Sequence, residues 1–256
     1  MMKLRIFRKA ADQEATYGVY DIEPRQGMTV LDALLQIHDR QDDSLSFRYS
    51  CRGAVCGSCA MLINKVPRLA CRTQVADLIG ETPMNLTPSQ SIGQTTGWDQ
   101  STEVLIEPLP NMRVIKDLVV DMEDFYAKYR RVQPTLRTQE VGERESLMGQ
   151  DIVRELESYT NCILCAACYG ACPVNGIDPK YIGSAALAKL YRFSIDPRDT
   201  AGQKRLELAD EPHGWWACKF YTNCNKVCPR EVPPNIAIGK SRQRLKEKKK
   251  TMEGET

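Results

Sequence analysis

Cysteine is the residue type that could do chemistry in this chain, and it occurs eleven times in 256 residues. An odd number does not suit a disulfide framework, so the binding of a metal or a cluster is the favoured interpretation. The most compact group, which we call the central run, has spacings of two, two and three intervening residues, and Pro173 directly follows it. Its members are Cys162, Cys165, Cys168 and Cys172. This spacing is typical of the bacterial-ferredoxin run, in which three thiolates hold one [4Fe–4S] cluster and the fourth ligates another.

A later segment, residues 218–229, repeats this run, and we call it the return segment. It supplies the thiolates that are needed if each segment ligates both clusters in a crossover arrangement. It has Tyr221 where the second cysteine would stand, and Pro229 follows its last cysteine; the cysteines are Cys218, Cys224 and Cys228. Crossover pairing predicts a [4Fe–4S] cluster on four thiolates, those of Cys162, Cys165, Cys168 and Cys228. It leaves three thiolates for a [3Fe–4S] cluster, those of Cys172, Cys218 and Cys224. The alternative is a [4Fe–4S] cluster with a non-cysteine ligand at Tyr221, since tyrosine ligates iron in catalase haem.

A third group of cysteines lies nearer the N-terminus and accounts for the remaining four. Its first three members are separated by four and two residues, and the fourth follows on a predicted strand; they are Cys51, Cys56, Cys59 and Cys71. This is the plant-type pattern for [2Fe–2S], and Gly53 and Gly57 would let the backbone wrap closely around a cluster. The alternative is a structural zinc site, but such sites usually consist of paired Cys-x-x-Cys knuckles, so no zinc is expected.

Composition limits the other classes of function. The 35 basic and 33 acidic residues give a net charge of +2, which offers no reason to expect a nucleic-acid partner. A hydrophobic fraction of 42% and a mean hydropathy of −0.41 describe a soluble globular protein. No segment approaches the roughly 18 to 20 apolar residues of a membrane span, and the N-terminus has no export signal.

The elements that must position the first cysteine group form a small sheet packed on one helix. Alternating patterns predict strands over residues 3–8 and 16–22, and Thr29 is the predicted N-cap of a helix over 30–38. A last strand is predicted over 104–106, and Pro108 and Pro110 then mark a boundary. We therefore expect two domains, residues 1–107 and 108–256.

The second domain is predicted to be mainly helical. Apolar residues at helical spacing predict an amphipathic helix over 114–126, and further helices are expected over 151–159 and 179–193. Trp215 and Trp216 could pack over the clusters or form an amphipathic belt at a membrane or a partner. The basic tail from residue 240 onward could be solvated or could contact an anionic membrane surface.

The cysteine layout resembles that of the iron–sulfur subunit of the succinate dehydrogenase and quinol:fumarate reductase family, over about residues 3–240. The stretches that carry the resemblance are 50–59, 106–111, 114–121 and 192–199. It implies an α+β fold, in which an N-terminal β-grasp plant-type [2Fe–2S] ferredoxin domain precedes a mainly α-helical bacterial-ferredoxin-like domain with two clusters.

The resemblance also implies a function. Such subunits pass single electrons between the FAD of a flavoprotein and the quinone at a membrane anchor, and the chain itself has no substrate-binding catalytic site. Alternatives are the electron-carrier subunit of another flavin oxidoreductase, or a free multi-cluster ferredoxin; the stretch from Ile106 to Asp121 favours the family.

One departure favours a particular branch of the family. Members that reduce ubiquinone have tryptophans after the run and a histidine after the first cysteine of the return segment, whereas here Val174-Asn175-Gly176 and Lys219 stand there. The pattern resembles that of fumarate reductases with a dihaem cytochrome b anchor (haem b, menaquinone); the family as a whole serves the tricarboxylic acid cycle or anaerobic respiration. The resemblance then implies a peripheral place on the cytoplasmic face of a bacterial inner membrane. The candidates for the quinone side or for tuning the clusters are Tyr221, Lys219, Pro173 and Trp216.

Overall fold

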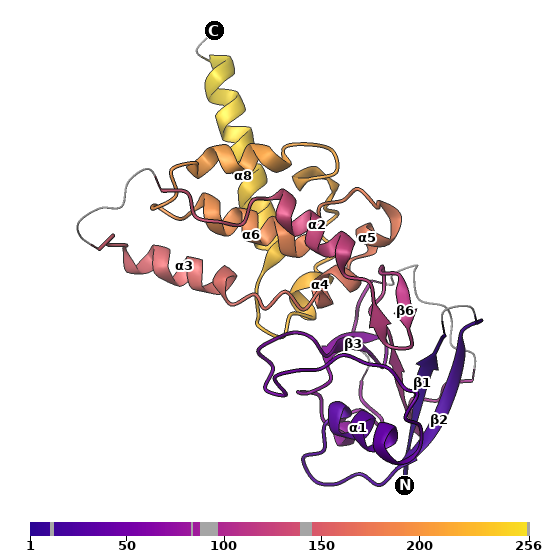
Figure 1. The fold of residues 1–256 in the computed structure, drawn as a ribbon. Coiled ribbons are helices and arrows are strands. Elements are labelled where there is room, and N and C mark those ends of the chain that lie inside the picture. The colour runs from indigo at the N-terminus through magenta and orange to yellow at the C-terminus, as the bar shows by residue number, and fades with distance from the viewer. Residues whose placement is uncertain (11–12, 83, 88–96, 139–144, 255–256) are drawn as a thin grey trace. The chain divides into compact units, whose positions relative to one another are not determined.

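The computed structural model describes the chain except for residues 11–12, 83, 88–96, 139–144 and 255–256 (Figure 1). It separates into two compact units, each described here by itself. The first comprises Met1–Met122 with Ile163–Ala171, and the second comprises Glu123–Cys162 with Cys172–Thr256. This division falls after Met122, later than the boundary that the prolines suggest, and it assigns part of the central cysteine run to the first unit. The two-domain limits 1–107 and 108–256 remain a prediction.

A five-stranded sheet forms the centre of the first unit, in the order β2-β1-β5-β3-β4. The strands are β1 (Met2–Arg8), β2 (Thr16–Ile22), β3 (Ala60–Ile63), β4 (Val66–Leu69) and β5 (Glu103–Glu107). β1 pairs in parallel with β5 and antiparallel with β2, while β3 pairs antiparallel with both β4 and β5. The predicted strands over 3–8, 16–22 and 104–106 are confirmed, although 104–106 is not the last strand.

One helix, α1 (Val30–Arg40), packs its apolar face on this sheet (Figure 1). It begins where the sequence predicts, because the Thr29 hydroxyl accepts from the Asp32 amide and the Asp32 carboxylate accepts from the Thr29 amide. The buried residues lie on one helical stripe and meet the sheet through Leu4, Ile6 and Ile106. A 3-10 turn, η1 (Val75–Asp77), follows β4.

The predicted helix over 114–126 is wrong in its first half. Residues there form a hairpin of β6 (Val114–Lys116) and β7 (Val119–Val120), and the helix α2 (Glu123–Arg131) begins only afterwards. The cause is Asp117, which is 1% exposed and has a left-handed backbone with φ of 45°. Its carboxylate accepts from Arg8 Nε at 3.1 Å and from the amides of Lys9 and Ser46 at 2.9 Å. These long-range bonds hold the hairpin in the first unit, which is why the division falls so late.

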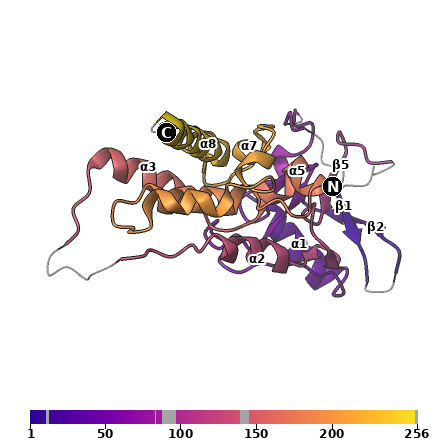
Figure 2. The ribbon, with the colours of Figure 1, turned by 90° about the horizontal axis from the view of Figure 1, so that it is seen from above.

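The second unit is built from helices and 3-10 turns (Figure 2). Besides α2 they are α3 (Gln150–Thr160), α5 (Pro173–Ile177), α6 (Ser184–Ser194), η2 (Gly202–Ala209), η3 (Trp215–Ala217), α7 (Asn223–Lys226) and α8 (Pro234–Gly254). The short helix α4 (Ala167–Gly170) belongs to the first unit. The helix predicted over 151–159 is confirmed, and the one predicted from residue 179 begins five residues later, at Ser184.

The core of this unit lies around α6, whose small residues admit close neighbours. Trp215 is fully buried and donates its indole N–H to the Leu206 carbonyl at 2.7 Å. A buried ion pair of Arg205 and Asp199 at 2.6 Å ties η2 to the loop before it. The tryptophans therefore differ, because Trp215 is core whereas Trp216 is only half-buried.

The basic tail forms the long helix α8, whose first half packs against α6 and whose C-terminal part extends away from it (Figure 1). Its first half presents a buried stripe to the core, consisting of Ala237, Ile238, Ser241 and Leu245. In the described part of the chain, no helix combines the length and the hydropathy that crossing a bilayer requires.

Candidate metal centres

The first cysteine loop, between α1 and β3, aims backbone N–H groups at sulfur. Cys51 Sγ accepts from the amides of Gly53 at 3.4 Å and of Val55 and Cys56 at 3.3 Å. The loop can do this because Arg52 and Ala54 take left-handed backbone conformations, with φ of 54° and 57°. Such N–H···S bonds stabilise negative charge on sulfur, which is the surrounding that an iron–sulfur cluster needs.

The other thiols of this group come from the same loop and from the end of β4. The Cys51 amide donates to Cys56 Sγ and the Cys71 amide donates to Cys59 Sγ, both at 3.5 Å. Hydrogen bonds from Ser58 and Cys51 lower the pKa of Cys56 to about 6, while burial raises the pKa of Cys59 to about 12. A ligated iron would compensate the burial of Cys59, because a coordinating thiol is deprotonated. The predicted [2Fe–2S] residues are thus brought together, and they fit the cluster.

Gly57 in this loop has a role that the sequence did not show. A Cβ atom on Gly57 would lie 2.8 Å from both Cα and Cβ of Cys165 and 2.9 Å from the Ile163 carbonyl oxygen. Its φ of +74° also belongs to the left-handed region that favours glycine. The first cysteine loop therefore packs backbone to backbone against the segment 163–171 within the first unit. No spacing in the sequence reveals this contact, because the two segments are a hundred residues apart.

The four residues predicted to hold the [4Fe–4S] cluster are divided between the two compact units. Cys165 and Cys168 lie in the first unit, where the Asn111 side chain donates to the Gly170 carbonyl at 3.0 Å. Cys162 and Cys228 lie in the second unit and interact electrostatically; burial and the proximity of Cys162 raise the pKa of Cys228. Cys228 Sγ also accepts from the Val232 amide at 3.3 Å. The grouping of all four around one cluster remains a prediction.

The three residues predicted for the last cluster all lie in the second unit and act on one another electrostatically. Burial and the neighbouring Cys172 and Cys218 raise the pKa of Cys224 to about 12, and burial raises that of Cys172. Hydrogen bonding by Ser184, at the start of α6, opposes this rise at both Cys172 and Cys224. Buried thiols that interact in this way fit a cluster better than free thiols, since iron stabilises the thiolates that burial disfavours.

Two tyrosines lie differently at this third site. Tyr221, which stands where the run would have a cysteine, is 40% exposed. Tyr181 is fully buried, and Cys218, Cys172 and Cys224 act on it electrostatically. Neither Tyr181 nor Ser184 was a candidate from the sequence, because neither belongs to a cysteine motif.

The candidates for the quinone side are scattered over the surface and the interior. Lys219 is exposed, whereas Pro173 is buried as the first residue of α5. Trp216 donates its indole N–H to Asp210 at 2.6 Å, and the cations of Arg242 and Lys246 lie 5.4 and 5.9 Å from its ring. The half-buried Trp216 is therefore held by polar partners rather than by the core.

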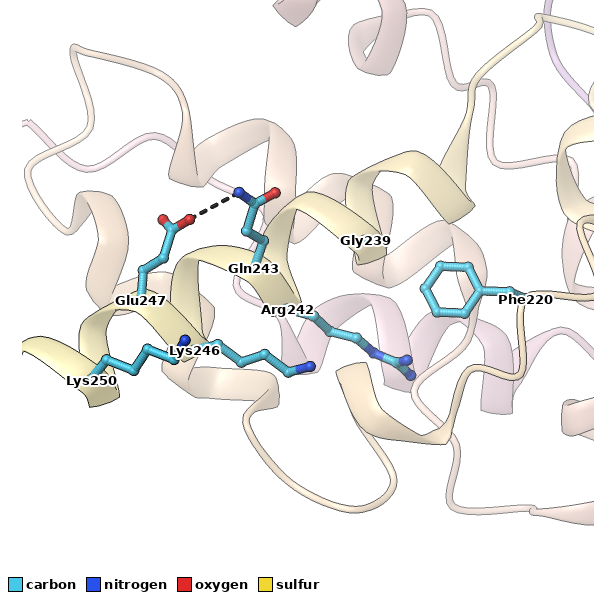
Figure 3. A pocket seen from close by; sticks show the side chains of 7 residues that line it. All are labelled: Phe220, Gly239, Arg242, Gln243, Lys246, Glu247 and Lys250. Carbon is cyan, nitrogen blue, oxygen red and sulfur yellow. Dashed lines mark hydrogen bonds between the residues drawn. The ribbon is translucent and has the colours of Figure 1, made fainter.

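Arg242 of α8 binds the backbone at the start of the return segment. Its guanidinium donates to the Trp215 carbonyl at 2.7 Å and to the Cys218 carbonyl at 2.8 Å, and it lies 4.8 Å from the Phe220 ring. Figure 3 shows Arg242 reaching toward Phe220 in a surface cavity of about 460 Å³ that Lys246 and Lys250 also line. On the same helix, Gln243 donates to Glu247 at 2.9 Å (Figure 3).

Two models of known protein families match the parts of the chain that contain the cysteine groups. A family model described as a 2Fe-2S iron-sulfur cluster binding domain matches residues 3–127, and one described as a 4Fe-4S dicluster domain matches residues 158–232. The class is thus a three-cluster protein built from two ferredoxin-type domains, which confirms the predicted fold class.

Relatives identify the family within this class. The chain is 33% identical to the fumarate reductase iron-sulfur subunit of Haemophilus influenzae, over 90% of this chain and 87% of that protein. It is 34% identical to the subunit of the same name from Mycobacterium tuberculosis, over 93% and 89%. Among solved structures, a chain of the Mycobacterium smegmatis Sdh1 complex in the apo form matches with a TM-score of 0.81 and 25% identity, over 97% of this chain and 96% of that one.

The chain therefore belongs to the iron–sulfur subunits of the fumarate reductase and succinate dehydrogenase family. Its role is electron transfer as one subunit of a larger complex, and its cofactors are a [2Fe–2S], a [4Fe–4S] and a [3Fe–4S] cluster.

Proposed function

We propose that the chain connects the FAD of a flavoprotein subunit to a membrane anchor, in a quinol:fumarate reductase or succinate:quinone reductase. Succinate loses two electrons and two protons to become fumarate, and a quinone that accepts two of each becomes the quinol; the chain carries the electrons in either direction. When bound, each cluster accepts and releases one electron at a time. The observation that carries the proposal is the contact of Gly57 with Cys165, because it places the first cysteine loop directly against the second.

We assign the cluster ligands from the sequence spacing, and interactions within each unit support parts of the assignment. We assign [2Fe–2S] to Cys51, Cys56, Cys59 and Cys71. We assign [4Fe–4S] to Cys162, Cys165, Cys168 and Cys228. The [3Fe–4S] ligands are Cys172, Cys218 and Cys224. The electrostatic coupling of Cys162 with Cys228, and of Cys224 with Cys172 and Cys218, supports the crossover pairing.

The chain's own residues hold these ligands and set their surroundings. The amides of Gly53 and Val55 stabilise negative charge at Cys51 Sγ, and burial excludes water from Cys59 and Cys224. Arg242 fixes the backbone that carries Cys218. The chain offers no substrate site in this proposal, so the chemistry of succinate and fumarate belongs to the flavoprotein.

The fumarate reductase direction, with a dihaem cytochrome b anchor and menaquinone, is the finer part of the proposal. The relatives named fumarate reductase support it, as does Lys219, which stands where ubiquinone-reducing members have histidine. Trp216 and Tyr221 remain candidates for the quinone side because both are partly exposed.

A place on the cytoplasmic face of a bacterial inner membrane is supported by the charge of α8. Lys246 and Lys250 line the cavity on this helix, and no carboxylate pairs with either of them in the described part of the chain. Each cation beside an anionic leaflet contributes on the order of 1 kcal/mol of attraction.

Purification of the native protein from its membranes tests the proposal. We expect the chain to co-purify with a large flavoprotein and with a membrane subunit whose haem b appears in the reduced-minus-oxidised absorption spectrum. Fumarate reduction by a reduced naphthoquinone should exceed succinate oxidation by a ubiquinone analogue. A chain that purifies with its clusters but without a flavoprotein would refute the proposed partners.

A further inference from the structure

The hydroxyl of Tyr181 is a buried donor without an acceptor. The side chain is 0% exposed, and its oxygen has no hydrogen-bond partner among the residues that the structure describes. Leaving such a group unsatisfied costs roughly 1 to 3 kcal/mol, so a native structure retains it only where something compensates.

The surroundings of Tyr181 indicate what the missing acceptor is. Tyr181 belongs to the core of the second unit, and Cys172 and Cys218 pack against that core. Burial is the largest cause of the raised pKa of Tyr181; the three thiols of the third site also raise it, and the Ser184 side chain opposes the rise, as it does at Cys172 and Cys224. The pocket into which the hydroxyl is buried is therefore the pocket of the proposed [3Fe–4S] cluster.

A leucine or phenylalanine would fill the same core position without an unsatisfied oxygen. The backbone at this position is held by hydrogen bonds, since the Tyr181 amide donates to the Asp178 carbonyl at 3.1 Å and the Ile182 amide donates to the His213 carbonyl at 3.0 Å. A donor fixed in this way beside three thiolates is suited to hydrogen-bond a cluster sulfur.

We propose that Tyr181 donates its O–H to a sulfur of the [3Fe–4S] cluster and thereby raises the reduction potential of this cluster. The donor acts by stabilising the extra negative charge of the reduced state, as hydrogen bonds to cluster sulfurs generally do. Tyr181 is then a tuning residue outside every cysteine motif. This inference rests on the proposed assignment of Cys172, Cys218 and Cys224 to the third cluster.

The test is a redox titration of the purified complex, followed by the EPR signal of the oxidised third cluster, in the wild type and in Tyr181→Phe. Loss of the hydroxyl should shift the ratio of oxidised to reduced cluster about tenfold toward oxidised at a fixed potential. For a one-electron couple this is a decrease of 59 mV. In the wild type, exchange into D₂O should remove one strong proton coupling from the pulsed EPR spectrum of this cluster, and Tyr181→Phe should lack that coupling from the start.

Tyr191→Phe is the matched control. Tyr191 is also fully buried in the second unit, but its hydroxyl has an acceptor, Glu155 Oε1 at 2.7 Å, and no cysteine is among the groups that shift its pKa. This variant loses the same atom and should leave the potential and the proton coupling unchanged.

The outcomes separate the inference from the assignment on which it rests. If the wild type shows no [3Fe–4S] signal, the assignment of the third cluster fails. If the signal is present and Tyr181→Phe leaves both the potential and the coupling as in the wild type, the role of Tyr181 is refuted. An equal shift in Tyr181→Phe and Tyr191→Phe would also refute it, because that result reports a general loosening of the core.

Discussion

The central run and the return segment share one backbone shape but differ in one ligand. In the central run, Cys165 stands between Leu164 and Ala166, whose φ values of 53° and 62° are left-handed. In the return segment, Tyr221 stands between Phe220 and Thr222, with φ of 56° and 63°. A short helix follows each turn, α4 in the first case and α7 in the second.

This likeness shows that the turn does not depend on a cysteine at its centre. A left-handed conformation costs a residue other than glycine roughly 1 to 2 kcal/mol, and the return segment retains two of them without a cysteine between them. One benefit is local, since the turn lets the Phe220 amide donate to Cys218 Sγ at 3.4 Å. The backbone of Tyr221 thus has the conformation of a cluster-ligating cysteine, while its side chain is 40% exposed. The two turns therefore differ in the chemistry of the side chain at their centre.

The largest expected effect comes from removing the one ligand that the central run is proposed to give to the third cluster. Cys172→Ser should abolish the [3Fe–4S] EPR signal and lower quinone-linked activity by more than the roughly 10- to 100-fold typical of lost outer-shell partners. The signal of the [4Fe–4S] cluster should persist, because Cys172 is not one of its proposed ligands. Loss of the [4Fe–4S] signal with retention of the [3Fe–4S] signal would contradict the crossover pairing.

Supplying the missing thiolate should make the two segments alike. Tyr221→Cys is expected to convert the third cluster toward [4Fe–4S] and to lower its potential by an amount on the order of 100 mV, within the wide span that such clusters cover. EPR of oxidised and reduced protein measures the conversion. Tyr221→Phe is the control and should leave the cluster type unchanged; if it destroys the cluster instead, the phenolate is a ligand and the three-thiolate assignment is wrong.

A smaller effect is expected where the first cysteine loop meets the central run. Gly57→Ala should destabilise the first unit by roughly 2 to 4 kcal/mol, because the new methyl group meets the backbone of Cys165 and the φ of +74° is strained for alanine. Thermal unfolding followed by cluster absorption measures this.

Gly80→Ala separates the two causes. Gly80 also has a left-handed φ of +70°, but a Cβ atom there meets nothing within 4 Å. It should cost roughly 1 kcal/mol from the backbone alone. Equal losses in the two variants would show that the contact with Cys165 carries no energetic weight.

Much of the first unit could be predicted from its sequence, because its signals are local. The alternation of apolar and polar residues predicted β1 and β2. The start of α1 was predicted from Thr29, whose hydrogen bonds with Asp32 join residues only three positions apart. The hairpin at Asp117 was missed, since its apolar residues also fit a helical period and its bonds reach Arg8 and Ser46. Trp215 and Trp216 could not be distinguished either, because only η2 and α8 decide which ring is buried.

The spacing of the eleven cysteines predicted three clusters, because ligation of iron–sulfur clusters imposes local spacings. The family followed from the resemblance of this layout together with stretches such as 106–121. The tertiary structure decided what surrounds those ligands. It brought Gly57 against Cys165, left Tyr221 exposed and buried Tyr181 where three thiols act on it electrostatically. These features join residues that are distant in the chain, and packing between such residues leaves no period or motif in the sequence.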